Sequence, residues 1–590
     1  MTPPTLLTQW ARLLLGSLRE AGLTDVVVSP GSRSTPFTAA ALADAGLRCR
    51  IVIDERAAGF FAVGHARMTG RPVLLVCTSG TAGANYFPAV VEASEAGVPL
   101  LILTADRPLE LQDAAAPQTI DQVHLYGSHV RAFFEIGTPD ADPAALRALP
   151  RVAAQAHAAT RAPVPGPVHI NARARKPLEP RVATTPEDAA LRDTVDRLLA
   201  RVPRAWSGGS GPDDEAIEAA ARACRTARSG LIVCGPAHVH EAAPAGAVDA
   251  LARATGFPVV AEAASQLRFG DPVSGALHAF PALLDVPGFA GAHAPHVVVQ
   301  VGRPPTASAW YAAFERWQDA RRYVLADRGW PDPWSAASAV IRTSLGPGVR
   351  ALAVRIAEDP GPDEAARARA TWAEAVRRAE EEARGAIEES LRGPFSEGAA
   401  VRTVVEALPS GSVLALGNSL PIREVDVFAP AGRTGLAVWS QRGANGIDGL
   451  VAGAEGAAAA TGRPTTLLLG DVSLAHDIGG LATLRDLPAP LTVVVLNNGG
   501  GRIFERLPVA EALGGDPRLD AWLTPPGIDF AAAAAAFGLD HARADDPASV
   551  AAGLEELAGA GGVLEVLVPE GGTTAHQRRL GRAIRERLQA

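Results

Sequence analysis

Two oxygen-bearing side chains near the C-terminus have a spacing that suits metal chemistry. Asp471 follows the apolar run 465–469, and Asn498 follows the apolar run 491–496. One helix and one strand fit between them, and a βαβ unit of that length places both side chains at the same carboxyl-end edge of a parallel sheet. A carboxylate, an amide oxygen and a nearby backbone carbonyl suit Mg²⁺, which keeps its other positions for diphosphate and water. The alternative is a chance strand-end Asp beside a turn rich in Asn and Gly.

Glu55 is a second candidate for chemistry. It follows the apolar run 50–53 and opens a segment, 55–69, with the composition of a helix. Taken alone, a carboxylate at this place is explained as a favourable charge at the N-terminus of a helix. Its role therefore depends on what else the chain contains.

The elements that must position these residues alternate between short apolar strands and alanine-rich helices. Strands are predicted within 24–32, 50–55, 72–80 and 99–108, then within 230–235, 257–263, 296–302 and 321–328, and finally within 412–419, 465–473, 491–500 and 562–569. This rhythm predicts an α/β protein with three doubly wound parallel-sheet domains, at 1–185, 186–360 and 361–590. Helices are expected at the N-terminus, over 362–393, and in the alanine-rich runs near 450–462 and 530–538. The basic tail from His576 to Gln589 is expected to be a solvated helix face.

The charge balance excludes one class of partner. The chain has 55 Lys+Arg against 64 Asp+Glu, a formal net charge of −9, and Lys176 is its only lysine. A negative surface argues against non-specific nucleic-acid binding, which depends on neutralising many phosphates. No apolar run approaches the roughly 20 residues of a membrane span, and four scattered cysteines suggest neither a disulfide framework nor a zinc site. We therefore expect a cytoplasmic protein with reduced thiols.

The chemical candidates together resemble the signature of thiamine diphosphate enzymes. Gly470-Asp471-Val472-Ser473 followed by Asn497-Asn498 is similar to the GDG…NN signature of that class, with Val472 in place of the second glycine. The segment 78–93 is similar to the strand, turn and helix that follow the activating glutamate. In this resemblance Glu55 hydrogen-bonds the aminopyrimidine of the cofactor and promotes its reactive tautomer. The cofactor itself supplies the electron sink.

Longer motifs narrow the resemblance to one family. They are SPGSRSTP at 29–36, TADRP at 104–108, QTIDQ at 118–122, GPVHIN at 166–171, GNSLPIR at 417–423, RGANGIDG at 442–449 and GGGRIFERLP at 499–508. Together they resemble the 2-succinyl-5-enolpyruvyl-6-hydroxy-3-cyclohexene-1-carboxylate synthases, transferases of menaquinone biosynthesis. The resemblance implies decarboxylation of 2-oxoglutarate and 1,4-addition of the resulting carbanion to isochorismate. It also implies thiamine diphosphate, Mg²⁺ or Mn²⁺, and a homodimer or homotetramer whose cofactor lies between subunits.

The resemblance assigns roles to individual residues. It implies Glu55 as the catalytic residue. The substrates bring several carboxylates, which arginine binds well because its charge is permanent and its donors are planar. The implied substrate-binding residues, all expected in strand-end turns, are Ser32, Arg33, Arg107, Gln118, Ser419, Arg423 and Arg442. The implied cofactor-binding residues are Glu55, Ile447, Asp471, Val472, Ser473, Asn498, Gly500, Arg502, Ile503 and Phe504, with Leu507 on the pocket wall. The implied metal ligands are Asp471, Asn498 and Gly500.

Two departures from the family pattern affect substrate binding. Pro117 stands before Gln118 where many members have Asn-Gln, so one amide donor is lost. The strand 297–302 is often followed in the family by a T-G-K-R sequence with two cations, whereas this chain has Thr306-Ala-Ser-Ala309. Arg303, just before that turn, is one candidate replacement, whereas Lys176 lies too early in the chain.

Three other functions are compatible with parts of the pattern. A simple 2-oxoacid decarboxylase or acetolactate-type synthase would share Glu55, Asp471 and Asn498 but would not require the dense arginine set. A silent thiamine-diphosphate-binding module would not need Glu55. A nucleotide-dependent oxidoreductase using the middle domain would need the G-x-G-x-x-G fingerprint, which is absent there.

Overall fold

The computed structural model describes residues 3–206, 208–209, 211–432, 435–514, 516–569 and 572–589. The chain forms two compact units. Unit 1 comprises Met1–Gly208, Gln441–Thr461 and Gly479–Asp486, and unit 2 comprises Gly209–Ser440, Gly462–Ile478 and Leu487–Ala590. Each unit is described by itself.

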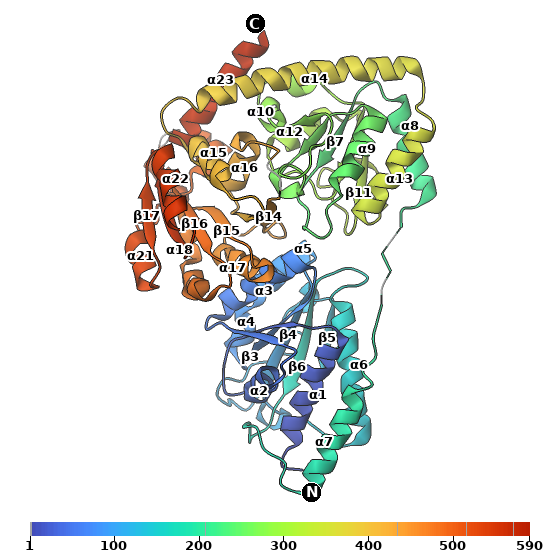
Figure 1. Cartoon of the computed structure of the whole chain (residues 1–590), viewed down its shortest axis with the longest axis vertical. Coiled ribbons are helices and arrows are strands. Elements are labelled where there is room, and N and C mark those ends of the chain that lie inside the picture. Colours follow the sequence, from blue (N-terminus) through green and yellow to red (C-terminus); the bar gives the residue numbers. More distant parts are fainter. Residues whose placement is uncertain are drawn as a thin grey trace. The chain divides into compact units, whose positions relative to one another are not determined.

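Three six-stranded sheets organise the residues described (Figure 1). The first has the order β2 (Arg48–Ile51), β1 (Asp25–Val28), β3 (Val73–Cys77), β4 (Leu100–Asp106), β6 (Pro167–Arg173) and β5 (Ala132–Glu135). The second has the order β12 (Ala337–Arg342), β11 (Arg321–Ala326), β10 (Val297–Val301), β7 (Gly230–Cys234), β8 (Val259–Ala261) and β9 (Ala276–Leu277). The third has the order β14 (Ala437–Ser440), β13 (Val413–Leu416), β15 (Thr465–Gly470), β16 (Leu491–Asn497), β18 (Gly562–Leu567) and β17 (His541–Ala544). Every pairing is parallel, which confirms the predicted fold class.

Helices connect and cover these strands. Those of unit 1 are α1 (Leu6–Ala21), α2 (Thr35–Ala43), α3 (Glu55–Thr69), α4 (Thr81–Asn85), α5 (Phe87–Ala96), α6 (Pro143–Ala159), α7 (Pro186–Leu199) and α17 (Leu450–Thr461). Those of unit 2 are α8 (Asp214–Thr226), α9 (Ala245–Thr255), α10 (Phe280–Leu284), α11 (Phe289–Ala292), α12 (Ala309–Arg316), α13 (Leu345–Glu358), α14 (Asp363–Ser390), α15 (Glu397–Ala407), α16 (Leu420–Phe428), α18 (Asp471–His476), α19 (Pro508–Leu513), α20 (Asp520–Leu523), α21 (Phe530–Ala536), α22 (Pro547–Glu556) and α23 (Gly572–Gln589). The expected helices near 362–393, 450–462 and 530–538 are confirmed as α14, α17 and α21.

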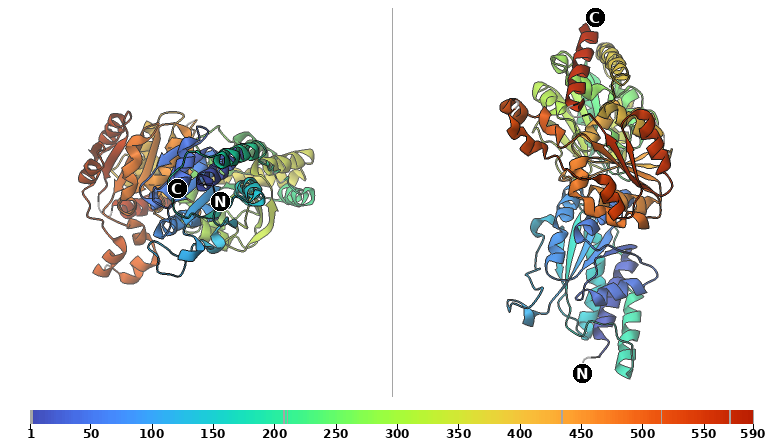
Figure 2. Two further views of the ribbon diagram at one scale, coloured as in Figure 1. Left: turned by 90° about the horizontal axis from the view of Figure 1, so that it is seen from below. Right: turned by 90° about the vertical axis from the view of Figure 1, so that its left-hand side faces the viewer.

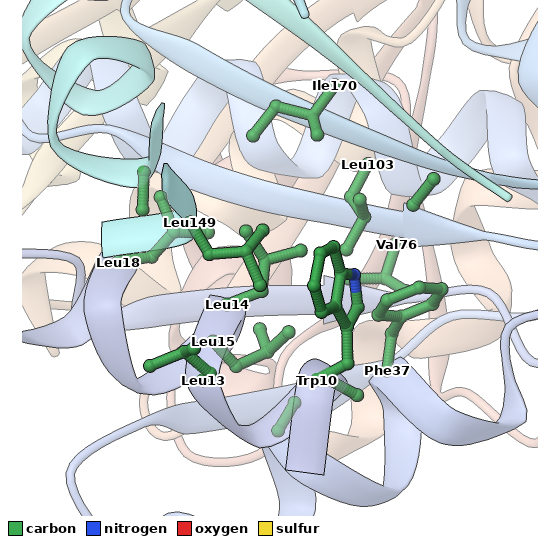
Figure 3. Close-up of a cluster of buried hydrophobic side chains, with 14 of the residues drawn as sticks. Trp10, Leu13, Leu14, Leu15, Leu18, Phe37, Val76, Leu103, Leu149 and Ile170 are labelled. Atoms are coloured by element: carbon green, nitrogen blue, oxygen red, sulfur yellow. The ribbon is translucent and has the colours of Figure 1, made fainter. Parts of the chain in front are cut away.

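The N-terminal helix α1 supplies one wall of the core of unit 1. Its Trp10 lies beside Phe37 of α2, and next to Val76 and Leu103 of the first sheet (Figure 3). Strands β4 and β6 are buried at every position, as expected for central strands of a parallel sheet, although β6 also carries His169, Asn171 and Arg173. The same core includes side chains of α7, so it continues past residue 185. The expected domain boundaries stay predictions.

Close backbone contact joins α3 to α17 inside unit 1. A Cβ atom added to Gly64 would lie 1.9 Å from the carbonyl oxygen of Gly453, and one added to Gly456 would lie 2.0 Å from that of Phe61. Only glycine permits such an approach. The contact holds the middle of α3, the helix that begins at Glu55, against α17.

The C-terminal helix corrects one expectation. Helix α23 packs beside α14 in unit 2 (Figure 2), and its Leu580 and Ile584 are buried in a core shared with that helix. The basic tail therefore has one buried apolar face as well as its charged face. No helix within the described ranges is both long enough and apolar enough to cross a membrane.

A buried histidine makes the stability of unit 1 depend on pH. His157 of α6 is buried, and burial, followed by the charge of Arg161, lowers its pKa to about 4. Its folded pKa lies below the unfolded value of about 6.5, so the neutral ring favours folding above pH 6.5 and that contribution is lost as the pH falls towards 4.

We predict that His157→Gln flattens this acid dependence. Between pH 6.5 and pH 5, the protein should lose about 1.5 kcal/mol more of its unfolding free energy than the variant does. Urea titrations at the two pH values measure this difference. Equal losses in both proteins would contradict the assignment.

Candidate functional site

The predicted metal and diphosphate residues of unit 2 lie at one sheet edge. Strand β15 ends at Gly470, strand β16 ends at Asn497, and the two are adjacent in the third sheet. Asp471 is 1% exposed and Asn498 is 5% exposed. One oxygen of Asp471 accepts the backbone N–H of Gly500 at 2.7 Å, and the other accepts that of Val472 at 2.8 Å. The structure thus places Asp471 beside the turn that begins at Asn498.

One polar atom at this edge lacks the partner that burial demands, and a neighbouring carboxylate is desolvated. The side-chain oxygen Oδ1 of Asn498 is buried and has no hydrogen-bond partner, whereas its Nδ2 donates to Glu397 at 3.1 Å. Burial raises the pKa of Asp471, against the lowering effect of the backbone N–H donors. A buried acceptor without a donor and a desolvated carboxylate are both stabilised by a cation. The donor set therefore fits a divalent metal.

Gly500 shapes the turn that carries these donors. Its φ is +124°, and an added Cβ would lie 2.4 Å from the carbonyl oxygen of Leu523. No other residue fits this position. The backbone N–H of Gly500 is thus held against Asp471, whereas its carbonyl, the third expected metal ligand, accepts the N–H of Arg502 at 2.8 Å.

Glu397 is a member of this site that the sequence analysis missed. It is buried at the start of α15, accepts hydrogen bonds from Asn498 and from the Thr573 hydroxyl, and burial raises its pKa. By holding Nδ2 of Asn498, it directs Oδ1 away towards the site. No local motif marks Glu397, because its partners lie far away in the sequence.

The remaining cofactor residues of unit 2 surround the same turn. Val472 and Ser473 lie in α18, and Arg502, Ile503 and Phe504 lie in a 3₁₀ helix, η5 (Arg502–Arg506). Arg502 donates to the carbonyl of Asn498 at 3.0 Å and to Glu505 at 2.7 Å. Arg502 therefore stabilises the turn that begins at Asn498. Leu507, expected on a pocket wall, is 41% exposed.

In unit 1, Glu55 is the first residue of α3. Asp54 caps this helix by accepting the N–H of Arg56, which leaves the Glu55 carboxylate free of the capping role. Burial is the main cause that raises the pKa of the Cys77 thiol, and the charge of Glu55 adds to it. The carboxylate therefore lies near the end of β3.

Two expected substrate arginines are neighbours at the carboxyl end of the first sheet. Arg33 and Arg107 are both buried. Arg33 donates to the carbonyl of Ala174 at 2.7 Å, but its Nε is buried without a partner, and Arg107 donates to the hydroxyl of Ser79. Burial, followed by the charge of Arg107, lowers the pKa of Arg33. Two buried cations with an unused donor suit an anionic ligand.

The other expected residues of unit 1 differ in their surroundings. Ser32 and Gln118 are exposed, and Gln118 has a φ of +53°. By contrast, Gln122, at the other end of the same motif, is buried. It accepts a hydrogen bond from the N–H of Gly80 and donates one to Oδ1 of Asn171. Arg442 and Ile447 lie half-buried in the loop before α17, which Glu92 holds through the N–H groups that follow Arg442.

Ser419 and Arg423 lie in unit 2, and Arg423 corrects an expectation. It lies inside α16, one turn after the strand-end residue Ser419, and it donates to the carbonyl of Ser419. Ser419 has φ +72° and ψ −128°, a strained conformation for a residue with a side chain, and its hydroxyl does not cap the helix. Strain of this kind is typical of residues whose position serves a ligand.

The structure thus gathers the expected residues into two groups. Unit 1 contains Ser32, Arg33, Glu55, Arg107, Gln118, Arg442 and Ile447. Unit 2 contains Ser419, Arg423, Asp471, Val472, Ser473, Asn498, Gly500, Arg502, Ile503 and Phe504. Acid–base and anion-binding groups dominate the first set, and the metal-type donors belong to the second.

Two family models match the N-terminal and C-terminal parts of the chain. Residues 8–125 match the family described as thiamine pyrophosphate enzyme, N-terminal TPP binding domain, and residues 438–567 match the corresponding C-terminal TPP binding domain. The chain is 46% identical to the 2-succinyl-5-enolpyruvyl-6-hydroxy-3-cyclohexene-1-carboxylate synthase of Sorangium cellulosum, over 98% of this chain and 96% of that one. It is 40% identical to the protein of the same name from Myxococcus xanthus, over 97% and 96% of the two chains.

A solved structure supports the fold alone. Benzoylformate decarboxylase from Polynucleobacter necessarius superposes with a TM-score of 0.66 at 17% identity, covering 95% of this chain and 98% of that one. Such low identity is no guide to the substrate.

We predict that Asp471→Asn weakens metal-dependent binding of thiamine diphosphate at least 10-fold, because it removes the one charged donor of the set. Calorimetric titration of the apoprotein with thiamine diphosphate at fixed Mg²⁺ measures the change. Asp540→Asn, which removes an exposed carboxylate of the same unit, is the control. Equal affinities in all three proteins would remove Asp471 from the metal site.

We also predict that Ser419→Gly raises the free energy of unfolding by about 1 kcal/mol, because glycine relieves the strained backbone. The same change should lower activity by removing the hydroxyl. Urea midpoints and turnover measure the two effects. Ser274→Gly, at an exposed position outside the positive-φ region, should give no stabilisation. A less stable Ser419→Gly variant would refute the strain.

Proposed function

The chain belongs to the family of 2-succinyl-5-enolpyruvyl-6-hydroxy-3-cyclohexene-1-carboxylate synthases, and from this we propose that it joins 2-oxoglutarate to isochorismate with loss of CO₂. It is a thiamine diphosphate-dependent transferase of menaquinone biosynthesis. The observation that carries the proposal is the near full-length similarity, within which Glu55, Asp471 and Asn498 are all present. In the structure, Asp471 and Asn498 lie at adjacent strand ends and Glu55 is the first residue of α3.

The metal-type donors of unit 2 hold the cofactor. Asp471, Asn498 Oδ1 and the carbonyl of Gly500 would hold the divalent ion that the diphosphate of the cofactor requires. When bound, thiamine diphosphate supplies the electron sink that allows a 2-oxo acid to lose CO₂. Glu55 would hydrogen-bond the aminopyrimidine of the bound cofactor and so favour its reactive tautomer.

The buried arginines Arg33 and Arg107 bind carboxylate groups of the substrates. Arg33 and Arg107 offer permanent positive charge and planar donors in a buried setting, where a carboxylate is held strongly. One carboxylate of 2-oxoglutarate leaves as CO₂ and the other remains. Binding of the remaining carboxylate therefore positions the reacting carbon. A held substrate adds to isochorismate faster than a mobile one.

We infer a homodimer or homotetramer as the working form. Glu55 and the metal-type donors belong to different units of the chain, and Ile53, two residues before Glu55, is 88% exposed. An apolar side chain beside a catalytic carboxylate suits cover by a second subunit. The cytoplasmic location also stays a prediction.

The test of this function is product analysis. Purified protein with 2-oxoglutarate, isochorismate, thiamine diphosphate and Mg²⁺ should form the cyclohexene carboxylate product and CO₂, and omission of any one component should abolish the product. Aldehyde release without isochorismate, and no adduct with it, would instead identify a simple decarboxylase.

We predict that Glu55→Gln lowers turnover by about 10²–10⁴-fold, the usual contribution of an acid–base group. Cofactor affinity should change far less, because the metal-type donors are intact. Steady-state rates and calorimetric titration measure the two. Glu187→Gln, an exposed position on α7, is the control. Substantial turnover by Glu55→Gln with both substrates would refute the role of Glu55.

A further inference from the structure

A small cavity in unit 2 lies against the turn that lacks the family's two cations. It has a volume of about 60 Å³, and Ala307, Ser308 and Ala309 form part of its wall. Glu262 fixes this turn by accepting hydrogen bonds from the backbone N–H of Thr306 at 2.5 Å and from its hydroxyl at 3.0 Å. The position of the 306–309 turn in the cavity wall is therefore fixed by hydrogen bonds.

Two arginines also line this cavity, together with Asp285, Gln577 and several apolar side chains. The arginines are Arg423 of α16 and Arg506, the last residue of η5. Arg303, the replacement suggested by the sequence, does not line the cavity as the described residues form it. Arg506 lies within the 499–508 motif, but the motif gave it no role, because it is far from the 306–309 turn in the chain.

Arg506 has unused hydrogen-bond capacity. Among the residues that the structure describes, its one ion-pair contact is with Asp285 at 3.9 Å, and it makes no hydrogen bond through its side chain. That side chain is only 28% exposed. A guanidinium has five N–H donors, so a half-buried one without hydrogen bonds has donors available for a ligand.

The cavity is electrostatically suited to an anion. Burial, and then the charge of Arg506, lower the pKa of Arg423, while the charges of Glu262, Asp426 and Tyr311 raise it by smaller amounts. Arg506 and Arg423 therefore lie close enough to repel each other. An anion between them would turn this repulsion into two attractions.

We propose that Arg506, together with Arg423, forms a carboxylate subsite for one of the two substrates, in place of the cations missing at Ser308 and Ala309. The inference rests on the proposed function. A cavity of this volume has room for a carboxylate group. The η5 helix that carries Arg506 begins at Arg502, which donates to the carbonyl of Asn498, so the subsite is joined to the metal-type turn.

The test compares Michaelis constants in enzyme that is already shown to make the product. Arg506→Gln should raise the KM of either 2-oxoglutarate or isochorismate about 10- to 100-fold, as expected for loss of a charged hydrogen bond, with a much smaller change in kcat. Titrating each substrate separately shows which carboxylate uses the subsite. Arg506→Lys, which keeps the charge but not the planar fork, should give an intermediate KM.

Two further variants separate substrate binding from a structural role. Asp285→Asn removes the ion-pair partner of Arg506, so it should leave KM unchanged or lower it; a rise like that of Arg506→Gln would show a structural role instead. Arg578→Gln, at an exposed position on α23, should match the parent protein. Unchanged KM values for both substrates in Arg506→Gln would overturn the inference, whereas a parent protein that makes no product would overturn the proposed function first.

Discussion

Burial of the Asp471 carboxylate is the constraint on which the rest of the site depends. This group is almost fully removed from water, its pKa is raised by that burial, and backbone N–H groups compensate it only in part. Beside it, the buried Oδ1 of Asn498 has no donor. The fold tolerates both because a divalent cation can satisfy them together. Gly500, Glu397 and Arg502 are each placed so that this arrangement persists.

Four arginines carry positive charge at sheltered positions of the chain. The overall charge is negative, yet Arg33 and Arg107 are buried at the edge of the first sheet, and Arg423 and Arg506 line a cavity of unit 2. The arginines thus occupy sheltered positions where an anion is bound more strongly than at an exposed surface. Permanent charge matters there, because burial lowers the pKa of a cationic group.

Much of the fold follows from local sequence. The central strands are apolar on both faces, so their positions and the α/β class were predictable, as was the meeting of Asp471 with the Asn498 turn. Edge strands such as β5, β12 and β17 are only partly buried. Their sequences therefore give little signal for a strand. Glu397 and Arg506 could not be predicted, because their partners are brought near only by the folded chain. Arg423 was expected in a turn, since the sequence alone does not show where α16 begins.

The most direct test of the metal site is anomalous diffraction from crystals of the protein grown with Mn²⁺ and thiamine diphosphate. We expect an anomalous peak from a Mn²⁺ ion that is bound by the carboxylate of Asp471, by Oδ1 of Asn498 and by the carbonyl oxygen of Gly500. A fully occupied Mn²⁺ elsewhere, with Oδ1 of Asn498 still lacking a partner, would contradict it.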